Sequence, residues 1–235
     1  MIRQVPIAIV AHPRREAYAN KLATRVAADA VCWDIDKIGP ERNHLKAWEW
    51  LADSGQGFGV VLEDDVIPTR NFRHNVNQAI KHAPTRLIAL YLGRGRPPQH
   101  QQAISRTITR PVSFITAPRL LSAQAYILPT ELFARWKEVR HFFGHQDQRR
   151  PIDEAISAWV DHKVGEKFSY TRFSLVDHLD GPTLVRHPDG QDRNGKTALH
   201  TEDCDPKGAA LPEIRKAWLL SSGQVDWTCG SMELS

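Results

Sequence analysis

Apolar and polar positions alternate with two different periods along the first 92 residues. Short apolar runs with the length of buried strands lie at residues 6–11, 30–35, 58–62 and 86–92. The segments between them repeat apolar residues at helical spacing, and they lie at residues 16–28, 41–52 and 71–82. Strands that alternate with helices predict a mostly parallel α/β sheet covered on both faces.

Two of these helices show which face should be buried. The first predicts an apolar face that includes Tyr18, Leu22 and Val26, with Ala19 beside them. In the second, Leu45, Trp48 and Leu51 recur at a spacing of three.

The pattern changes after residue 92. Residues 93–102 are basic, rich in Gly and Pro and typical of a loop, and residues 144–151 and 180–206 are also loop-like. Further strands are expected at 111–116, 123–128 and 168–176, and helices at 130–139, 153–162 and 213–220. Thr130 is a suitable N-cap for the first of these helices. We expect one domain over 1–235, divided into segments at 1–92, 93–206 and 207–235.

The composition is that of a soluble globular protein. The 235 residues are 41% hydrophobic, and no apolar run approaches the roughly 20 residues of a membrane-spanning helix. The N-terminus lacks the pattern of a signal peptide. The cysteines are Cys32, Cys204 and Cys229, an odd number without a C-x-x-C pair, which favours free thiols in a reducing cytoplasm over a zinc or dithiol site.

The charge balance leaves an anionic partner open. The formal net charge is +4, and the 21 arginines outnumber the 10 lysines. Arginine suits bidentate contacts to phosphate and carboxylate, but an excess of four charges over 235 residues is mild.

The acidic triplet Glu63-Asp64-Asp65 is the most informative motif. It follows an apolar strand directly and precedes Val66-Ile67-Pro68. Ligands of open α/β sheets bind at the carboxyl ends of the strands, and clustered carboxylates there suit Mg²⁺ or Mn²⁺. A solvated acidic turn is the alternative, and the position of the triplet favours the cation site.

Segments in a fixed order resemble glycosyltransferase family 25, whose members include lipopolysaccharide-type sugar transferases and collagen galactosyltransferases. Val60–Val66 is similar to the family's acidic "LEDD" signature. The other matching segments are Ile7–Val10 with Arg14-Arg15, Asn43–Trp48, Ala125–Pro129, Pro151–Glu154 and Leu175–His178. The resemblance covers about residues 5–187, and the segment 93–111 matches no pattern of the family.

This resemblance implies a GT-A-like fold, a metal ion and a nucleotide-sugar donor, most often a UDP-sugar. It implies that 1–92 is the nucleotide-sugar-binding half and 93–206 the acceptor-side half, followed by a tail at 207–235. It implies Mn²⁺ or Mg²⁺ held at Asp65, with Glu63 and His178 as further candidate ligands. The candidate donor-binding residues are Arg14, Arg15, Asp34, Asp36, His44 and Asp64. For each of these, a structural or solvated role is the alternative.

A sugar hydroxyl needs a base to take its proton, and the resemblance implies inverting transfer. Asp153 and Glu154 open a predicted helix, where acids also interact favourably with the helix dipole. Adjacent helical residues point about 100° apart, so only one is expected to face the site. We favour Asp153 and keep Glu154 as the alternative.

Three interpretations of function follow. The first is a metal-dependent glycosyltransferase acting on a glycan or protein. The second is the same reaction on hydroxymethylated DNA, as in some phage enzymes. It is suggested by basic residues that could contact DNA phosphates, namely Arg94, Arg96, Arg106 and Arg110. The third is a nucleotide-sugar-binding protein without catalysis.

Overall fold

The computed structural model of the protein describes residues 4–55, 57–93, 98–108, 110–144, 150–179 and 226–234. The helix expected at 213–220, the whole loop expected at 180–206, residues 145–149 of the loop expected at 144–151, and Arg94, Arg96 and Cys204 lie outside these ranges.

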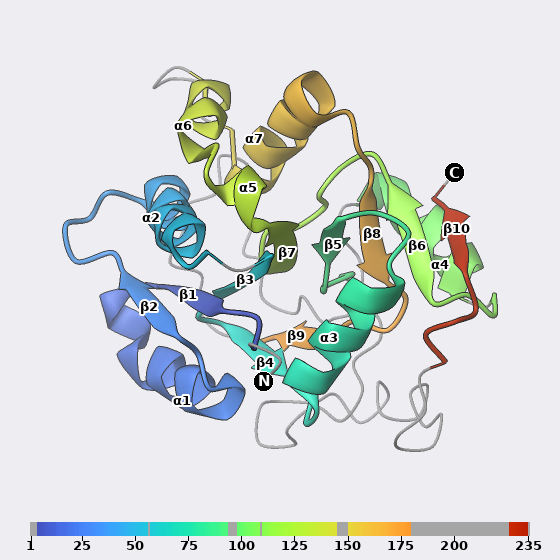
Figure 1. The fold of residues 1–235 in the computed structure, drawn as a ribbon, viewed down its shortest axis with the longest axis horizontal. Coiled ribbons are helices and arrows are strands. Elements are labelled where there is room, and N and C mark those ends of the chain that lie inside the picture. Colours follow the sequence, from blue (N-terminus) through green and yellow to red (C-terminus); the bar gives the residue numbers. More distant parts are fainter. Residues whose placement is uncertain are drawn as a thin grey trace.

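An eight-stranded mixed sheet forms the centre of the fold (Figure 1), and the strand order is β10-β6-β8-β5-β7-β3-β1-β2. The strands are β1 (Ile7–Ala11), β2 (Ala30–Trp33), β3 (Phe58–Glu63), β5 (Leu87–Ala89), β6 (Phe114–Ala117), β7 (Ala125–Pro129), β8 (Phe168–Thr171) and β10 (Ser231–Glu233). Five of them, β1, β2, β3, β5 and β8, run parallel, while β7 lies antiparallel between β3 and β5. The expected mostly parallel α/β fold is confirmed.

Helices cover both faces of the sheet. Helices α1 (Glu16–Val26) and α3 (Phe72–His82) pack on one face, and α2 (Pro40–Asp53), α5 (Thr130–Phe133), α6 (Trp136–Val139) and α7 (Ile152–Trp159) pack on the other (Figure 1). The residues of β1 alternate between these faces, so that Ala8 and Val10 meet α2 while Ile7 and Ile9 meet α1 and α3. None of the described helices is both long and apolar enough to cross a bilayer.

Close packing holds α2 and α5 against β3. A Cβ on Gly59 would come within 2.8 Å of Leu51 Cδ2 and 2.9 Å of Phe133 Cε2, so only glycine fits between the two helices and the strand. Trp48 packs edge-on against Phe133 and Trp159, with ring centroids 5.2 and 5.7 Å apart. The predicted burial of Trp48 and Leu51 is confirmed.

Three local predictions were wrong. Tyr18 is 53% exposed, because it lies about 70° around α1 from the centre of the face formed by Ala19, Leu22 and Val26. Thr130 is the first residue of α5 and not its cap, since Pro129 holds the cap position. The expected helix at 130–139 is two short helices.

Longer-range pairing changes other expectations. The described part of the basic segment after residue 97 is helical, with a 3-10 turn at Pro98–His100 followed by α4 (Gln101–Ile108). The run at 168–176 divides into β8 and β9 (Val176–His178), and β9 leaves the main sheet to pair antiparallel with β4 (Val66–Pro68). The C-terminal strand β10, for which the sequence carried no signal, pairs with β6.

Arg73 of α3 fastens the amino edge of the sheet. Its guanidinium donates to the carbonyl oxygens of Val5 (2.9 Å) and Val26 (2.7 Å), and to that of Ala27. It also contacts Asp29, whose carboxylate accepts the backbone N–H of Ile7 at 2.9 Å.

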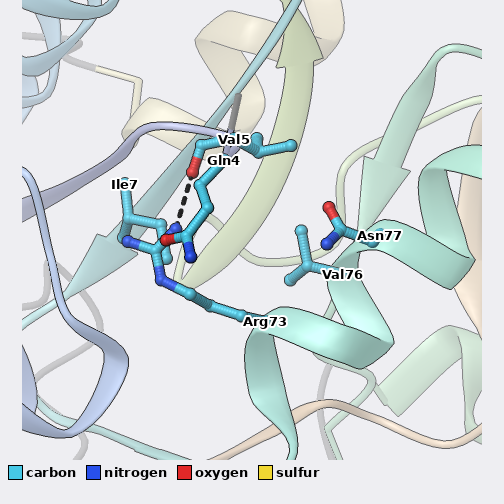
Figure 2. Close-up of a pocket in the computed structure, with 6 residues that line it drawn as sticks. All are labelled: Gln4, Val5, Ile7, Arg73, Val76 and Asn77. Carbon is cyan, nitrogen blue, oxygen red and sulfur yellow. Dashed lines mark hydrogen bonds between the residues drawn. The ribbon is translucent and has the colours of Figure 1, made fainter. Parts of the chain in front are cut away.

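A small pocket of about 50 Å³ lies beside this guanidinium (Figure 2), and it is lined by Gln4, Val5, Ile7, Arg73, Val76 and Asn77. This volume suits one or two water molecules and is far too small for a nucleotide. The amino edge is therefore structural.

Replacement of Arg73 tests this assignment. Arg73→Ala removes the donor to the carbonyl oxygens that follow α1 and precede β1, and we expect the free energy of unfolding to fall by about 2 kcal/mol. Chemical denaturation measures this change. Lys81→Ala, an exposed position on the same helix, is the control and should stay within about 0.5 kcal/mol. Equal effects of the two variants would contradict the assignment.

Candidate functional site

The acidic triplet lies at the carboxyl edge of the sheet, where the parallel strands β1, β3, β5 and β8 all end. This is the edge at which open α/β sheets bind ligands. Glu63 is the last residue of β3, and Asp64 and Asp65 form the turn to β4. Each of the three carboxylates has a different set of partners.

Asp64 fastens the loop after β1. Its Oδ2 accepts the backbone N–H of His12 at 2.7 Å, and its Oδ1 accepts from Arg15 at 3.0 Å. Burial and the neighbouring charge of Asp65 raise the pKa of Asp64 from its ordinary value of 3.8 to about 6, although the His12 N–H and Arg15 oppose the shift. Both oxygens are engaged, so Asp64 contributes to the shape and charge of the site.

Asp65 lies between two basic residues, Arg15 and His178. Its Oδ2 accepts from Arg15 Nη1 at 2.6 Å and lies 3.3 Å from His178 Nε2. Its Oδ1 is buried and has no hydrogen-bond partner among the described residues. Burial alone would raise the pKa of Asp65, but His178 and Arg15 outweigh it and the pKa is lowered. Asp65 is therefore a charged carboxylate with one unused oxygen.

The small sheet β4–β9 brings His178 to this carboxylate. In its register Val66 pairs with His178, and the backbone N–H of Leu179 donates to the Asp65 carbonyl oxygen at 2.7 Å. Residues more than 110 positions apart thus meet through backbone pairing, and the contact between Asp65 and His178 follows from it.

Arg15 is the cation between the two aspartates. A single nitrogen, Nη1, donates to both Asp64 and Asp65. Burial lowers the pKa of Arg15, but the two carboxylates outweigh burial and raise it, so the guanidinium stays charged. One positive charge between two negative charges leaves an excess of negative charge unless His178 is protonated.

Glu63 faces away from Asp64 and Asp65 and contacts His44 of α2. The distance from Glu63 Oε1 to His44 Nε2 is 3.1 Å, and the side chain of Glu63 is 29% exposed. His44 is completely buried, and its Nδ1 lies 3.2 Å from the Tyr126 hydroxyl. The predicted contact of His44 with a nucleotide is therefore replaced by contacts with Glu63 and Tyr126.

Asp153 lies in the first turn of α7 and Glu154 follows it. Glu154 is exposed, whereas Asp153 is partly buried and accepts the backbone N–H of Glu154 at 3.0 Å. Burial, with smaller contributions from the charges of Glu154 and Glu63, raises the pKa of Asp153 to about 6. The two candidate bases therefore differ in their exposure, since Asp153 is partly buried and Glu154 is exposed.

The other predicted donor contacts divide between buried and exposed positions. Asp34 is buried, and its carboxylate accepts the backbone N–H groups of Ile38 (2.7 Å) and Gly39 (3.2 Å), so it shapes the loop before α2. Asp36 and Arg14 are exposed at the ends of β2 and β1. Of Asp34, Asp36 and Arg14, only Asp36 and Arg14 are exposed to a ligand.

The sequence assigned no role to two residues of the site region, Asn43 and Tyr126. Asn43 Nδ2 bridges the carbonyl oxygens of Ala11 and Cys32, at 3.1 and 2.8 Å, and so ties together the ends of β1 and β2. The Tyr126 hydroxyl accepts a buried hydrogen bond of 2.7 Å from Trp48 Nε1 beneath His44. No local signal reveals the contact of Tyr126, because it depends on the register between β3 and β7, in which Val61 pairs with Tyr126.

The described residues contain no group of three or more His, Cys, Asp or Glu side chains placed to hold a metal ion. Asp65 and His178 nevertheless offer two ligands, a carboxylate oxygen without a hydrogen bond and an imidazole. Magnesium-type sites often use one or two protein ligands and complete the shell with water and substrate phosphates. Asp65 and His178 therefore fit a cation whose remaining ligands come from water and a diphosphate. Glu63 does not belong to this pair of candidate ligands.

The basic segment considered for DNA lies only partly in the described chain. Arg106 of α4 and Arg110 are exposed.

A scan of protein-family models gives no match to this chain, and a search of curated proteins gives none either. The geometry of the site therefore carries the functional inference.

Replacement of Arg15 should reveal the charge repulsion between Asp64 and Asp65. In the wild type, the raised pKa of Asp64 means that the folded protein binds more protons than the unfolded chain between about pH 4 and pH 6. Its contribution to stability therefore falls as the pH rises through that window. Arg15→Ala removes the counter-charge, so we expect a loss of about 3 kcal/mol at pH 8 and a smaller loss at pH 5.

Urea denaturation at the two pH values measures this difference. Arg14→Ala is the matched control, since Arg14 is exposed and its side chain makes no hydrogen bond or ion pair in the described structure. A penalty for Arg15→Ala that is the same at pH 5 and pH 8 would contradict the proposed charge balance.

Proposed function

We propose that the protein is a metal-dependent glycosyltransferase that moves a sugar from a nucleotide-sugar, a UDP-sugar by resemblance, to a hydroxyl of a glycan or protein. One observation carries the proposal. A buried, charged Asp65 with a free oxygen meets an arginine and a histidine at the carboxyl edge of an α/β sheet, on the same edge as a carboxyl whose pKa is raised to about 6. The motif resemblance to glycosyltransferase family 25 agrees with this arrangement.

The donor diphosphate is proposed to bind at Arg15 and Asp65. When bound at Asp65 and His178, Mn²⁺ or Mg²⁺ would neutralise the charge that develops on the diphosphate as the sugar leaves. Arg15 supplies a permanent positive charge that can turn from the carboxylates towards a phosphate oxygen. Exposed Arg14, at the end of β1, is available for the same anion.

Asp153 is proposed as the base. The acceptor oxygen forms a bond to the anomeric carbon, the bond from that carbon to the diphosphate breaks, and the Asp153 carboxylate takes the proton of the hydroxyl. A pKa near 6 suits this task, because the group is charged at neutral pH yet is a stronger base than an ordinary aspartate. Attack from the face opposite the leaving group inverts the anomeric centre.

Asp65→Asn tests the cation site. The amide keeps the shape of the side chain but loses the negative charge, so we expect Mn²⁺ to bind on the order of 100-fold more weakly in the presence of UDP. Isothermal titration calorimetry measures the affinity, and EDTA should abolish donor binding to the wild type. Asp53→Asn, which changes an exposed acid at the end of α2, is the control. Unchanged Mn²⁺ affinity in Asp65→Asn would remove Asp65 from the cation site.

Asp153→Asn tests the base. Without a proton acceptor we expect transfer to fall by about 10²- to 10⁴-fold while donor binding stays within about twofold. Transfer is measured as release of UDP in the presence of acceptor, after a thermal-shift screen of nucleotide-sugars has identified the donor. Glu154→Gln, at the exposed neighbouring position, should keep near-normal activity. The reverse result would move the base to Glu154.

The pH dependence of transfer provides an independent test. Asp153 must be deprotonated to act, so we expect the rate to rise with pH through an apparent pKa near 6 and then level off. The residual activity of Asp153→Asn should lack this rise. A wild-type rate that is flat from pH 5 to pH 7.5 would exclude Asp153 as the base.

A further inference from the structure

A chain of hydrogen bonds leads from the core to Glu63. Trp48 Nε1–H donates to the Tyr126 hydroxyl at 2.7 Å, this hydroxyl lies 3.2 Å from His44 Nδ1, and His44 Nε2 lies 3.1 Å from Glu63 Oε1. The first three side chains are completely buried, and only Glu63 reaches the exposed edge of the sheet. Buried polar groups are unfavourable unless they are hydrogen-bonded, so this chain holds one defined geometry.

The direction of each hydrogen bond follows from Tyr126. Burial raises the pKa of Tyr126 above its ordinary value, so the phenol keeps its proton. Its oxygen accepts from Trp48, and the phenol proton is then donated to His44 Nδ1. His44 consequently carries its own proton on Nε2 and donates it to Glu63 Oε1.

Glu63 therefore has one fixed oxygen and one available oxygen. Oε1 is held by His44, and no described residue donates a hydrogen bond to Oε2. Val61, Tyr126 and Glu63 point to the same face of the sheet, the face covered by α2 and α7. The Asp153 carboxyl, from α7, lies near enough for the charge of Glu63 to act on it.

We propose that Glu63 binds a ring hydroxyl of the transferred sugar, and that His44 and Tyr126 are positioning residues that aim it. The inference rests on the proposed function and adds the subsite for the sugar itself. With the diphosphate at Arg15 and Asp65 and the acceptor hydroxyl at Asp153, the sugar ring must lie between them. Glu63 is the last residue of β3, two positions before Asp65, and its charge contributes to the environment of Asp153, so we place it beside this ring. A carboxylate only accepts hydrogen bonds, and a sugar hydroxyl is a suitable donor.

The test compares donors that lack single hydroxyls. UDP-glucose, UDP-galactose and their 2-, 3-, 4- and 6-deoxy analogues are titrated into the wild type and Glu63→Ala with Mn²⁺ present. We expect Glu63→Ala to bind the complete donor about 10- to 100-fold more weakly. For one deoxy analogue the wild type should show the same loss, and Glu63→Ala should bind that analogue as well as the wild type does.

The positioning role has its own readout. Tyr126→Phe should weaken binding of the complete donor about 3- to 10-fold and leave binding of that one deoxy analogue unchanged. Tyr170→Phe is the matched control, because it removes another buried hydroxyl of the sheet, one that bonds only to the backbone of Arg119 and Leu121. It should discriminate among the deoxy donors as the wild type does.

The wild type also tests the hydrogen-bond chain without any substitution. Nitrogen-15 NMR of His44 should show a proton on Nε2 that is hydrogen-bonded, and a proton on Nδ1 would overturn the chain. If Glu63→Ala weakens every donor and analogue by the same factor, the sugar subsite is wrong while the proposed function stands. If the wild type binds neither complete UDP-sugar, the proposed donor class and the subsite both fall.

Discussion

Two adjacent buried aspartates at the end of β3 impose the constraint on which the rest of the site depends. Asp64 and Asp65 are each less than 10% exposed, and taking even one carboxylate out of water costs several kcal/mol unless partners replace the solvent. The chain meets this requirement with groups from distant parts of the sequence. The loop after β1 supplies the His12 N–H and Arg15, and β9 supplies His178. These contacts bring the ends of three chain segments to one place, and the same contacts assemble the candidate site.

The two edges of the sheet serve different purposes. At the amino edge, Arg73 satisfies backbone carbonyl oxygens around a pocket that holds at most a few water molecules. At the carboxyl edge, the carboxylates of Glu63, Asp65 and Asp153 are held by few partners, and Asp65 Oδ1 has none in the described chain. Side-chain donors satisfy backbone carbonyl oxygens at one edge, and polar groups available to a ligand are concentrated at the other.

Local sequence signals predicted most of the strands and helices of the first half, because hydrophobic periodicity is a local property. The same signals placed the acidic triplet at a strand end and the two acids at the start of α7, and both placements are confirmed. What failed depends on contacts between distant residues. The resemblance named His178 together with Asp65, but the pairing of β4 with β9 that brings them together was not predicted. The register of β3 with β7, which places Tyr126 beneath His44, was not predicted either. The sequence also did not distinguish the roles of the three consecutive acids. Their side chains reach different partners because Glu63 ends a strand and Asp64 and Asp65 form the turn after it. The buried positions of Asp34 and His44 likewise follow from loop and core packing that no motif encodes.

The most direct test of the central claim is a crystal structure with Mn²⁺ and UDP, with data collected at an X-ray energy where manganese scatters anomalously. Glycosyl transfer at this edge predicts an anomalous peak about 2.1 Å from Asp65 Oδ1 and from His178 Nε2, with the UDP diphosphate completing the coordination and Arg15 turned towards a phosphate oxygen. A well-ordered crystal that shows no manganese at Asp65, or shows UDP bound away from the carboxyl edge of the sheet, would contradict the account.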